Sequence, residues 1–230
     1  MEEMKYRAED EAFHKGIESI LNLGIEPKEF IHHFSCFTGH VNLARYLFFY
    51  ECYKKVTDLC GHIADIGTWK GASFFYFAKL VKLFENECQT QVHGFDWFKG
   101  MEPEEGQDNQ AYAGKYQAEY ETVAELIRLK RLDNLAFIHK LDLISELGSF
   151  FREQQQIRFK LVFLDCGISS VLENSMAHFW PRLVNGGILI LDHFNNTCSR
   201  NESEIIERYI DNRKVRQMPM ARQPSAYVVK

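Results

Sequence analysis

The chain has 230 residues, of which 46% are hydrophobic and 14% aromatic, and this is enough to close one sizeable core. Its formal net charge of -5 argues against a nucleic acid or an anionic membrane as partner, because either would favour a clustered excess of Lys and Arg. We therefore expect a small-molecule partner.

Cysteine spacing and hydropathy indicate the compartment. The six cysteines include no C-x-x-C pair, and no segment is typical of a secretory signal. No apolar run approaches the roughly 20 residues that cross a bilayer. We expect a cytoplasmic protein with reduced thiols.

The chain is expected to begin with a helical N-terminal cap over residues 1–60, followed by a core over residues 61–230. Within the cap, Leu43, Leu47 and Tyr50 recur near helical spacing. From His62 onward, short apolar runs alternate with amphipathic segments. The runs are HIADIG, VHGFDWF, LAFIHKLD, KLVFLDC and GGILILDHF. Their alternation with helices predicts a doubly wound, mostly parallel α/β sheet.

Two further segments complete the prediction. The polar stretch 101–117 is the best candidate for a mobile loop. Near the end, VRQMP and SAYVVK are expected to form a closing antiparallel pair around MARQP.

Acidic residues follow all five predicted strands. In open α/β sheets, ligands bind in a crevice beyond the carboxyl ends of the strands. The residues at those ends are Asp65, Asp96, Asp142, Asp165 and Asp192, the last of them beside His193. We interpret them as the lining of one crevice.

The first strand leads into DIGTWKGAS, in which two glycines lie four residues apart. Gly67 allows backbone angles closed to bulkier residues, and Gly71 lets the start of a helix approach a ligand. A dinucleotide fold would show G-x-G-x-x-G, whereas the wider spacing beside Asp65 suits a cationic ligand better. The alternative is a tight strand-to-helix turn with no ligand.

Two of the acids are placed to hold a nucleoside. Asp96 can accept both ribose hydroxyl protons, and Asp142 can accept from an adenine amino group. Both could instead be ordinary helix caps or turn residues. A cofactor that combines ribose, adenine and a positive sulfonium is S-adenosylmethionine.

With these motifs in order, the sequence resembles the class I methyltransferases, specifically the macrocin O-methyltransferase (TylF-type) family, over roughly residues 45–230. The resemblance depends on ADIGTWKGAS, GFDWFKGM, LVFLDC, WPRLVNGGILILDHF and SAYVVK. It implies a seven-stranded Rossmann-like sheet. It also implies an S-adenosylmethionine-dependent O-methyltransferase that acts on a hydroxyl of a sugar, nucleotide sugar or sugar-containing natural product.

The resemblance assigns a cofactor site. Its residues would be Asp65, Gly67, Thr68, Gly71, Ser73, Asp96, Trp97 and Asp142. Those from Asp65 to Ser73 would surround the methionine part of the cofactor. For Trp97, packing in the core or in a turn is the alternative role.

The resemblance also implies a reaction centre of Asp165, Asp192 and His193, with His193 or Asp165 as the base. These positions hold a divalent cation in several family members, so Mg²⁺ or Mn²⁺ is an expected second cofactor, and a histidine ligand shifts the preference away from Mg²⁺. The family's acid two residues after Asp165 is Gly167 here. A hydrogen-bonded cluster without metal is therefore the alternative.

Other functions stay open at this stage. One is a cephalosporin-hydroxylase-like relative, or a methyltransferase on a non-sugar small molecule. Another is a non-catalytic nucleoside-binding protein. The expected partner is a small-molecule sugar or nucleotide sugar, with neither nucleic acid nor membrane, and assembly into a homo-oligomer is left open.

Overall fold

The structure is a computed structural model that describes residues 7–197, 199, 201–210 and 215–230. Contacts divide the chain between Ala44 and Arg45 into two compact units, and each is described by itself. The division falls inside one helix, α4 (His40–Lys54), whose second half packs into the core of the larger unit. That residues 1–60 act as a cap stays a prediction.

The N-terminal unit is helical. Its elements before α4 are α1 (Arg7–Leu21), α2 (Pro27–His32) and α3 (Phe34–Phe37). Pro27 suits the first turn of α2, where a backbone N–H has no helical partner. The ring centroids of Phe30 and Phe37 lie 4.5 Å apart, yet no residue of α2 or α3 is buried.

The larger unit contains a six-stranded sheet in the order β3-β2-β1-β4-β5-β6. The strands are β1 (His62–Ile66), β2 (Val92–Asp96), β3 (Ala136–Lys140), β4 (Phe159–Leu164), β5 (Leu183–Leu191) and β6 (Ala226–Val229). The first five are parallel, and β6 pairs antiparallel with β5. All five predicted apolar runs are confirmed as strands. Every residue of β4 is buried, which explains its continuous apolar sequence.

The prediction of seven strands was wrong by one for the part of the chain that the structure describes. Arg216, from the predicted VRQMP strand, exchanges two backbone hydrogen bonds with Tyr227, at 2.9 and 2.8 Å, but forms only an isolated bridge. The chain then turns at Pro219, where the backbone N–H of Ala221 donates to the carbonyl of Met218. Because proline has no N–H to offer a ladder, pairing stops there.

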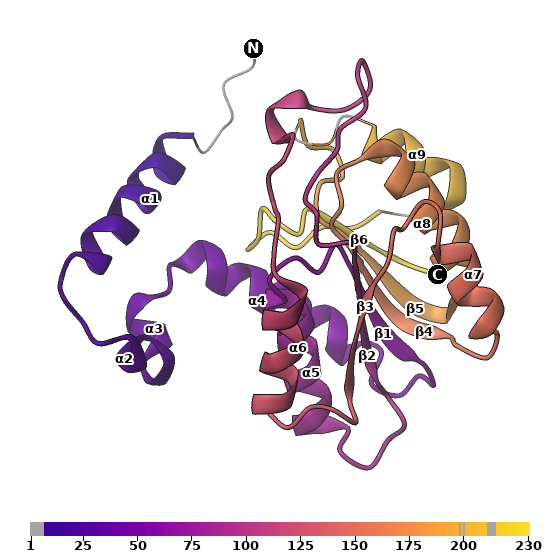
Figure 1. The fold of residues 1–230 in the computed structure, drawn as a ribbon, viewed down its shortest axis with the longest axis horizontal. Coiled ribbons are helices and arrows are strands. Elements are labelled where there is room, and N and C mark those ends of the chain that lie inside the picture. Colours follow the sequence, from indigo (N-terminus) through magenta and orange to yellow (C-terminus); the bar gives the residue numbers. More distant parts are fainter. Residues whose placement is uncertain (1–6, 198, 200, 211–214) are drawn as a thin grey trace. The chain divides into compact units, whose positions relative to one another are not determined.

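Helices cover both faces of the sheet (Figure 1). One face packs against α4, α5 (Ala72–Phe84) and α6 (Tyr120–Leu129). The other packs against α7 (Leu147–Glu153), α8 (Ser169–Arg182) and α9 (Glu202–Ile210). Neighbouring strand residues alternate between the two cores, as Leu161 and Val162 do. The doubly wound α/β fold is confirmed.

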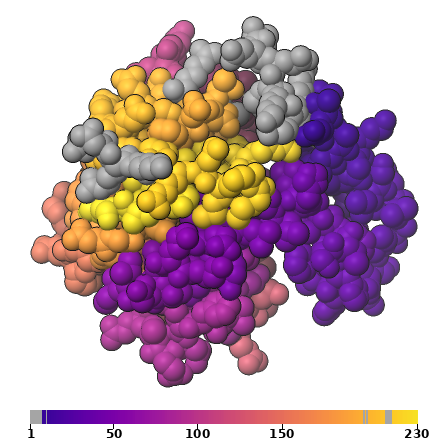
Figure 2. Space-filling model, turned by 180° about the vertical axis from the view of Figure 1, so that it is seen from behind, coloured from indigo at the N-terminus to yellow at the C-terminus, as the bar shows by residue number. Residues whose placement is uncertain are grey.

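The C-terminal strand lies at the edge of this sheet. In Figure 2 the yellow C-terminal segment fills the surface between orange and purple parts of the chain. Lys230 Nζ donates to the carbonyl of Leu183, and the rings of Phe48 and Tyr227 lie 6.0 Å apart. Among the described residues, no helix combines the length and apolar composition that crossing a bilayer requires.

Five of the six cysteines are free thiols. They are Cys36, Cys52, Cys60, Cys88 and Cys166. Cys198 lies outside the described residues.

One ion pair lies inside the core of the larger unit. Lys160 Nζ on β4 donates to Glu85 Oε2 at 2.6 Å, and Lys160 is completely buried. The hydroxyls of Tyr53 and Thr90 donate to the two oxygens of the same carboxylate, each at 2.7 Å. Glu85 therefore ties the ends of α4 and α5 to the start of β4.

We predict that Lys160→Met lowers the free energy of unfolding by about 3–5 kcal/mol, because it leaves Glu85 as an uncompensated buried charge. Urea unfolding at pH 7 measures the change. The double variant Lys160→Met/Glu85→Gln should recover part of the loss, since glutamine removes the buried charge and keeps one acceptor oxygen. A single variant as stable as the parent would contradict this.

Candidate functional site

Acidic side chains from four strand ends meet at the carboxyl edge of the sheet. Asp65 and Asp96 lie in β1 and β2, and Asp165 and Asp192 directly follow β4 and β5. The charges of Asp96 and Asp165 both act on the Asp65 carboxyl group. Four of the five predicted acids therefore form one cluster, close enough to act on one another electrostatically.

The two glycines are required by the turn itself. Gly67 has φ +82°, and a Cβ there would lie 1.9 Å from the carbonyl oxygen of Asp165. Gly71 has φ +87°, and a Cβ there would lie 2.8 Å from the ring of Phe75. Protein atoms rather than a ligand explain both residues, and helix α5 begins directly after Gly71 as predicted. Their contact with a cofactor stays a prediction.

Asp65 is a completely buried carboxyl group beside this turn. Ser73 Oγ donates to it at 3.0 Å, and Thr68 Oγ1 donates to its backbone carbonyl at 3.0 Å. Burial, with smaller contributions from Asp165 and Asp96, raises the pKa of Asp65 to about 7, although Ser73 and Arg45 oppose the shift. Within the described residues, no cation forms an ion pair with Asp65. A positive charge beside Asp65 would therefore stabilise its ionised form.

Asp96 joins the loops that follow β1 and β2. The backbone N–H of Trp69 donates to Oδ2 at 2.7 Å, and that of Phe98 donates to Oδ1 at 2.6 Å. Both donors have positive φ, +49° and +67°, so the carboxylate stabilises two unusual backbone conformations. Each oxygen keeps further acceptor capacity for a ligand. Trp97 Nε1 donates to the carbonyl of Gly100 at 2.6 Å, which favours a packing role in this turn.

Asp142 is built into a turn. Its carboxylate accepts from the backbone N–H of Ile144 at 2.9 Å and from Ser145 Oγ at 2.7 Å. Glu146 in return accepts from the Asp142 backbone N–H at 2.7 Å. Partial burial opposes them, but these donors dominate and lower the pKa of Asp142. The contacts are those of the capping alternative, and adenine binding stays a prediction.

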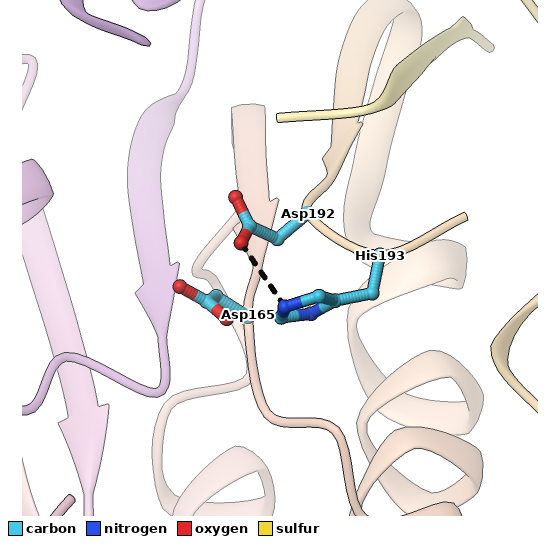
Figure 3. Close-up of side chains that lie close together, drawn as sticks. All are labelled: Asp165, Asp192 and His193. Carbon is cyan, nitrogen blue, oxygen red and sulfur yellow. Dashed lines mark ion pairs between the residues drawn. The ribbon is translucent and has the colours of Figure 1, made fainter. Parts of the chain in front are cut away.

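Asp165, Asp192 and His193 come together (Figure 3). Leu164 and Leu191 are register partners in the parallel pair β4–β5, so the residues that follow them are neighbours. His193 Nε2 lies 3.5 Å from Asp192 Oδ2, and His193 Nδ1 lies 3.7 Å from Asp165 Oδ1. One potential ligand atom from each residue lies within 4.8 Å of the others. Burial, with the nearby Asp165, raises the pKa of Asp192.

Arg45 on α4 is a site residue that sequence reasoning missed. Its Nη1 donates to Asp192 Oδ1 at 2.5 Å, and its Nη2 donates to Asp165 Oδ2 at 3.1 Å. The guanidinium carbon lies 5.2 Å from the ring centroids of both Phe49 and Phe163. One guanidinium therefore bridges two of the predicted reaction-centre acids. The sequence carries no local signal for this contact, which joins residues 120 and 147 positions apart.

Glu202, at the start of α9, is a second missed residue. It is completely buried, and its Oε1 accepts from the backbone N–H of His193 at 3.1 Å. Its Oε2 lies 4.0 Å from His193 Nδ1, and neither of these two buried atoms has a hydrogen-bond partner in the described part of the chain. Burial is the main cause that raises the pKa of Glu202 to about 8. In the sequence, an acid in the first turn of a helix is typical of helix stabilisation and gives no hint of this contact.

The loop over residues 101–117, magenta in Figure 1, is hydrogen-bonded to two other parts of the larger unit. Asp108 Oδ1 accepts from the backbone N–H of Ser169 at 3.0 Å and from its Oγ at 2.6 Å. Trp69 Nε1 donates to the carbonyl of Gln117 at 3.0 Å. The loop, which includes the short 3-10 helix Gln110–Tyr112, thus connects the start of α8 with the glycine turn.

Comparison with known proteins adds a family and a fold. The family of methyltransferase domains called Methyltransf_24 matches residues 64–194, more than half of the chain. No curated protein matches the chain.

Solved structures with the same fold include three methyltransferases. The calicheamicin methyltransferase CalS11 has a TM-score of 0.83 at 18% identity, over 100% of this chain and 98% of that one. A second CalS11 structure is described as a TDP-rhamnose 3'-O-methyltransferase. The O-methyltransferase NovP has a TM-score of 0.67 at 13% identity, over 82% and 80% of the two chains. MycE, solved with Mg and SAH, has a TM-score of 0.51 at 14% identity, over 84% and 55%.

The raised pKa of Asp65 gives a testable dependence of stability on pH. Because its folded-state value of about 7 exceeds its ordinary value of 3.8, ionisation of Asp65 costs the folded state an amount that grows up to pH 7. Asp65→Asn removes this cost. Between pH 5.5 and pH 8, the variant should gain about 2 kcal/mol of unfolding free energy relative to the parent, measured in urea.

Asp142→Asn is the matched control, because the pKa of Asp142 is shifted in the opposite direction. Its loss of stability relative to the parent should stay constant between pH 5.5 and pH 8, because the lowered folded-state pKa of Asp142 and its ordinary pKa of 3.8 both lie below this range. A pH-independent difference between Asp65→Asn and the parent would show that Asp65 ionises normally.

Proposed function

Because the chain belongs to the Methyltransf_24 family of methyltransferase domains, we propose that it transfers the methyl group of S-adenosylmethionine to a sugar hydroxyl. The acceptor would be a sugar, a nucleotide sugar or a sugar-containing natural product. The observation that carries the proposal is the acidic cluster at the carboxyl edge of the sheet, in which Asp65 and Asp96 lie near the trio of Asp165, Asp192 and His193. The fold shared with CalS11, described as a TDP-rhamnose 3'-O-methyltransferase, supports the sugar acceptor, as does the predicted TylF-type resemblance, and the fold shared with the O-methyltransferase NovP supports O-methylation.

The cofactor assignment follows from the charge of the crevice. Asp65 would hold the amino group of the methionine part near the sulfonium, because a buried carboxylate without a cation binds one favourably. Gly67, Thr68, Gly71 and Ser73 would complete this part of the site. For the nucleoside part of the cofactor, Asp96 would bind the ribose and Asp142 the adenine, with Trp97 beside them. MycE was solved with SAH, the demethylated product of the same cofactor.

The reaction would be an in-line displacement. The acceptor oxygen forms a bond to the methyl carbon while the carbon–sulfur bond breaks, and its electron pair converts the sulfonium to a neutral thioether. The hydroxyl proton moves to the His193 imidazole. The resulting imidazolium is stabilised by Asp192 and Asp165, whose oxygens lie 3.5 and 3.7 Å from its nitrogens.

The predicted divalent cation fits these residues poorly. Two carboxylates and an imidazole are suitable donors, and MycE was solved with Mg. In this chain, however, one oxygen of each carboxylate already accepts from Arg45. A divalent ion at the trio would have to lie beside that guanidinium. No step of the proposed reaction therefore involves a metal.

Methyl-tritiated S-adenosylmethionine with TDP-rhamnose as probe acceptor tests the function. We expect label in the sugar and one equivalent of S-adenosylhomocysteine. His193→Ala should lower kcat about 100-fold, because it removes the proton acceptor. It should leave the calorimetric affinity for the cofactor unchanged, whereas Asp65→Asn should weaken that affinity.

His14→Ala is the control, since His14 is an exposed histidine on α1, and it should match the parent. Absence of label from a panel of sugars, nucleotide sugars and glycosides, together with no heat on adding the cofactor or its product, would refute the proposal.

A further inference from the structure

We propose that the Arg45 guanidinium takes the place of the divalent ion in this reaction centre, so that methyl transfer here is independent of metal. The inference rests on the proposed function for the reaction itself. The part that concerns structure alone is that Arg45 occupies the carboxylate pair and so prevents a metal ion from binding. This part can be tested without any methyl acceptor.

The guanidinium is held by two carboxylates and two aromatic rings. Each of its two terminal nitrogens donates to a different carboxylate, Asp192 on one side and Asp165 on the other. The rings of Phe49 and Phe163 lie at cation–π distance from its carbon. Phe49 follows Arg45 by one helical turn and is completely buried, as is Phe163. The contacts on four sides fix the cation where it lies, with 26% of the side chain exposed.

Each of the four carboxylate oxygens faces a side chain of the site. Oδ1 of Asp192 and Oδ2 of Asp165 accept from Arg45. The other two oxygens face His193, at 3.5 and 3.7 Å. An ion that used those two oxygens and the imidazole would lie beside the guanidinium, where two like charges repel strongly in a partly buried site. Two carboxylates can balance the guanidinium and one imidazolium, whereas the guanidinium and a divalent ion together would leave a net positive charge. The arrangement therefore disfavours the divalent ion.

Arg45 thereby acts as a positioning residue. It neutralises one of the two carboxylates and turns their remaining oxygens towards His193, the proposed proton acceptor. Lysine would not reproduce this geometry, because its donors all sit on one nitrogen, whereas the planar guanidinium holds two separate nitrogens in a fixed arrangement, one towards each carboxylate.

Titration of the chelator-treated parent protein with Mn²⁺, followed by electron paramagnetic resonance, is the primary test. We expect no loss of the free Mn²⁺ signal. With S-adenosylmethionine and TDP-rhamnose, transfer should change less than about twofold when EDTA replaces Mg²⁺.

The variant Arg45→Met keeps the length and apolar stem of the side chain but removes its charge. It should bind one Mn²⁺ at least about tenfold more tightly than the parent, because two carboxylates then lack a cation. Its transfer rate without metal should fall about 100-fold, and Mn²⁺ should restore part of it. A purely structural role for Arg45 predicts no gain in Mn²⁺ binding.

Two variants control this result. Arg128→Met removes an exposed arginine that is paired with Glu125 on α6, and it should gain no Mn²⁺ binding. Arg45→Met/Asp192→Asn should lose the binding gained by Arg45→Met, which locates the ion. If Arg45→Met does not fold, as judged by circular dichroism, Arg45→Gln replaces it, since glutamine also removes the charge and should likewise gain Mn²⁺ binding.

Tight Mn²⁺ binding by the parent that Asp192→Asn abolishes would overturn the inference. So would transfer that EDTA abolishes and Mg²⁺ restores. If no acceptor is methylated, the proposed function fails, but the Mn²⁺ titrations of the parent and of Arg45→Met still decide whether Arg45 closes the site to metal.

Discussion

The bridge from Arg45 to Asp165 and Asp192 is the interaction on which the reaction centre depends. Parallel pairing of β4 with β5 brings two carboxylates together, and like charges at that distance repel. Burial adds to the cost for Asp192, which is almost completely inaccessible. A guanidinium from α4 offsets both penalties, so the helix that packs on one face of the sheet also sets the charge at its edge.

The sheet could be predicted from sequence because each strand is short, apolar and buried, and because helices separate the strands. The same regularity placed acids at the carboxyl edge. The prediction of a seventh strand was wrong for a local reason, because the chain turns at Pro219. The glycine motif was located correctly, but the atom that excludes a side chain at Gly67 belongs to the backbone of Asp165, far along the sequence.

Arg45 and Glu202 could not be predicted because their roles depend on tertiary contacts. Arg45 lies on a helix whose pattern explains its apolar neighbours and says nothing of where a long basic side chain ends. Glu202 occupies the first turn of a helix, where an acid is ordinary. Asp142 shows the converse case, in which a residue at a strand end has its own turn as partner.

The contact between Asp108 and Ser169 links the position of the 101–117 loop to the first turn of helix α8. The backbone N–H of Ser169 begins α8, and no neighbouring side chain caps that end. Lifting the loop would strip this donor of its acceptor and cost on the order of 1 kcal/mol. Movement of the loop is therefore linked to fraying of the first turn of α8, so the contact favours the loop position seen here.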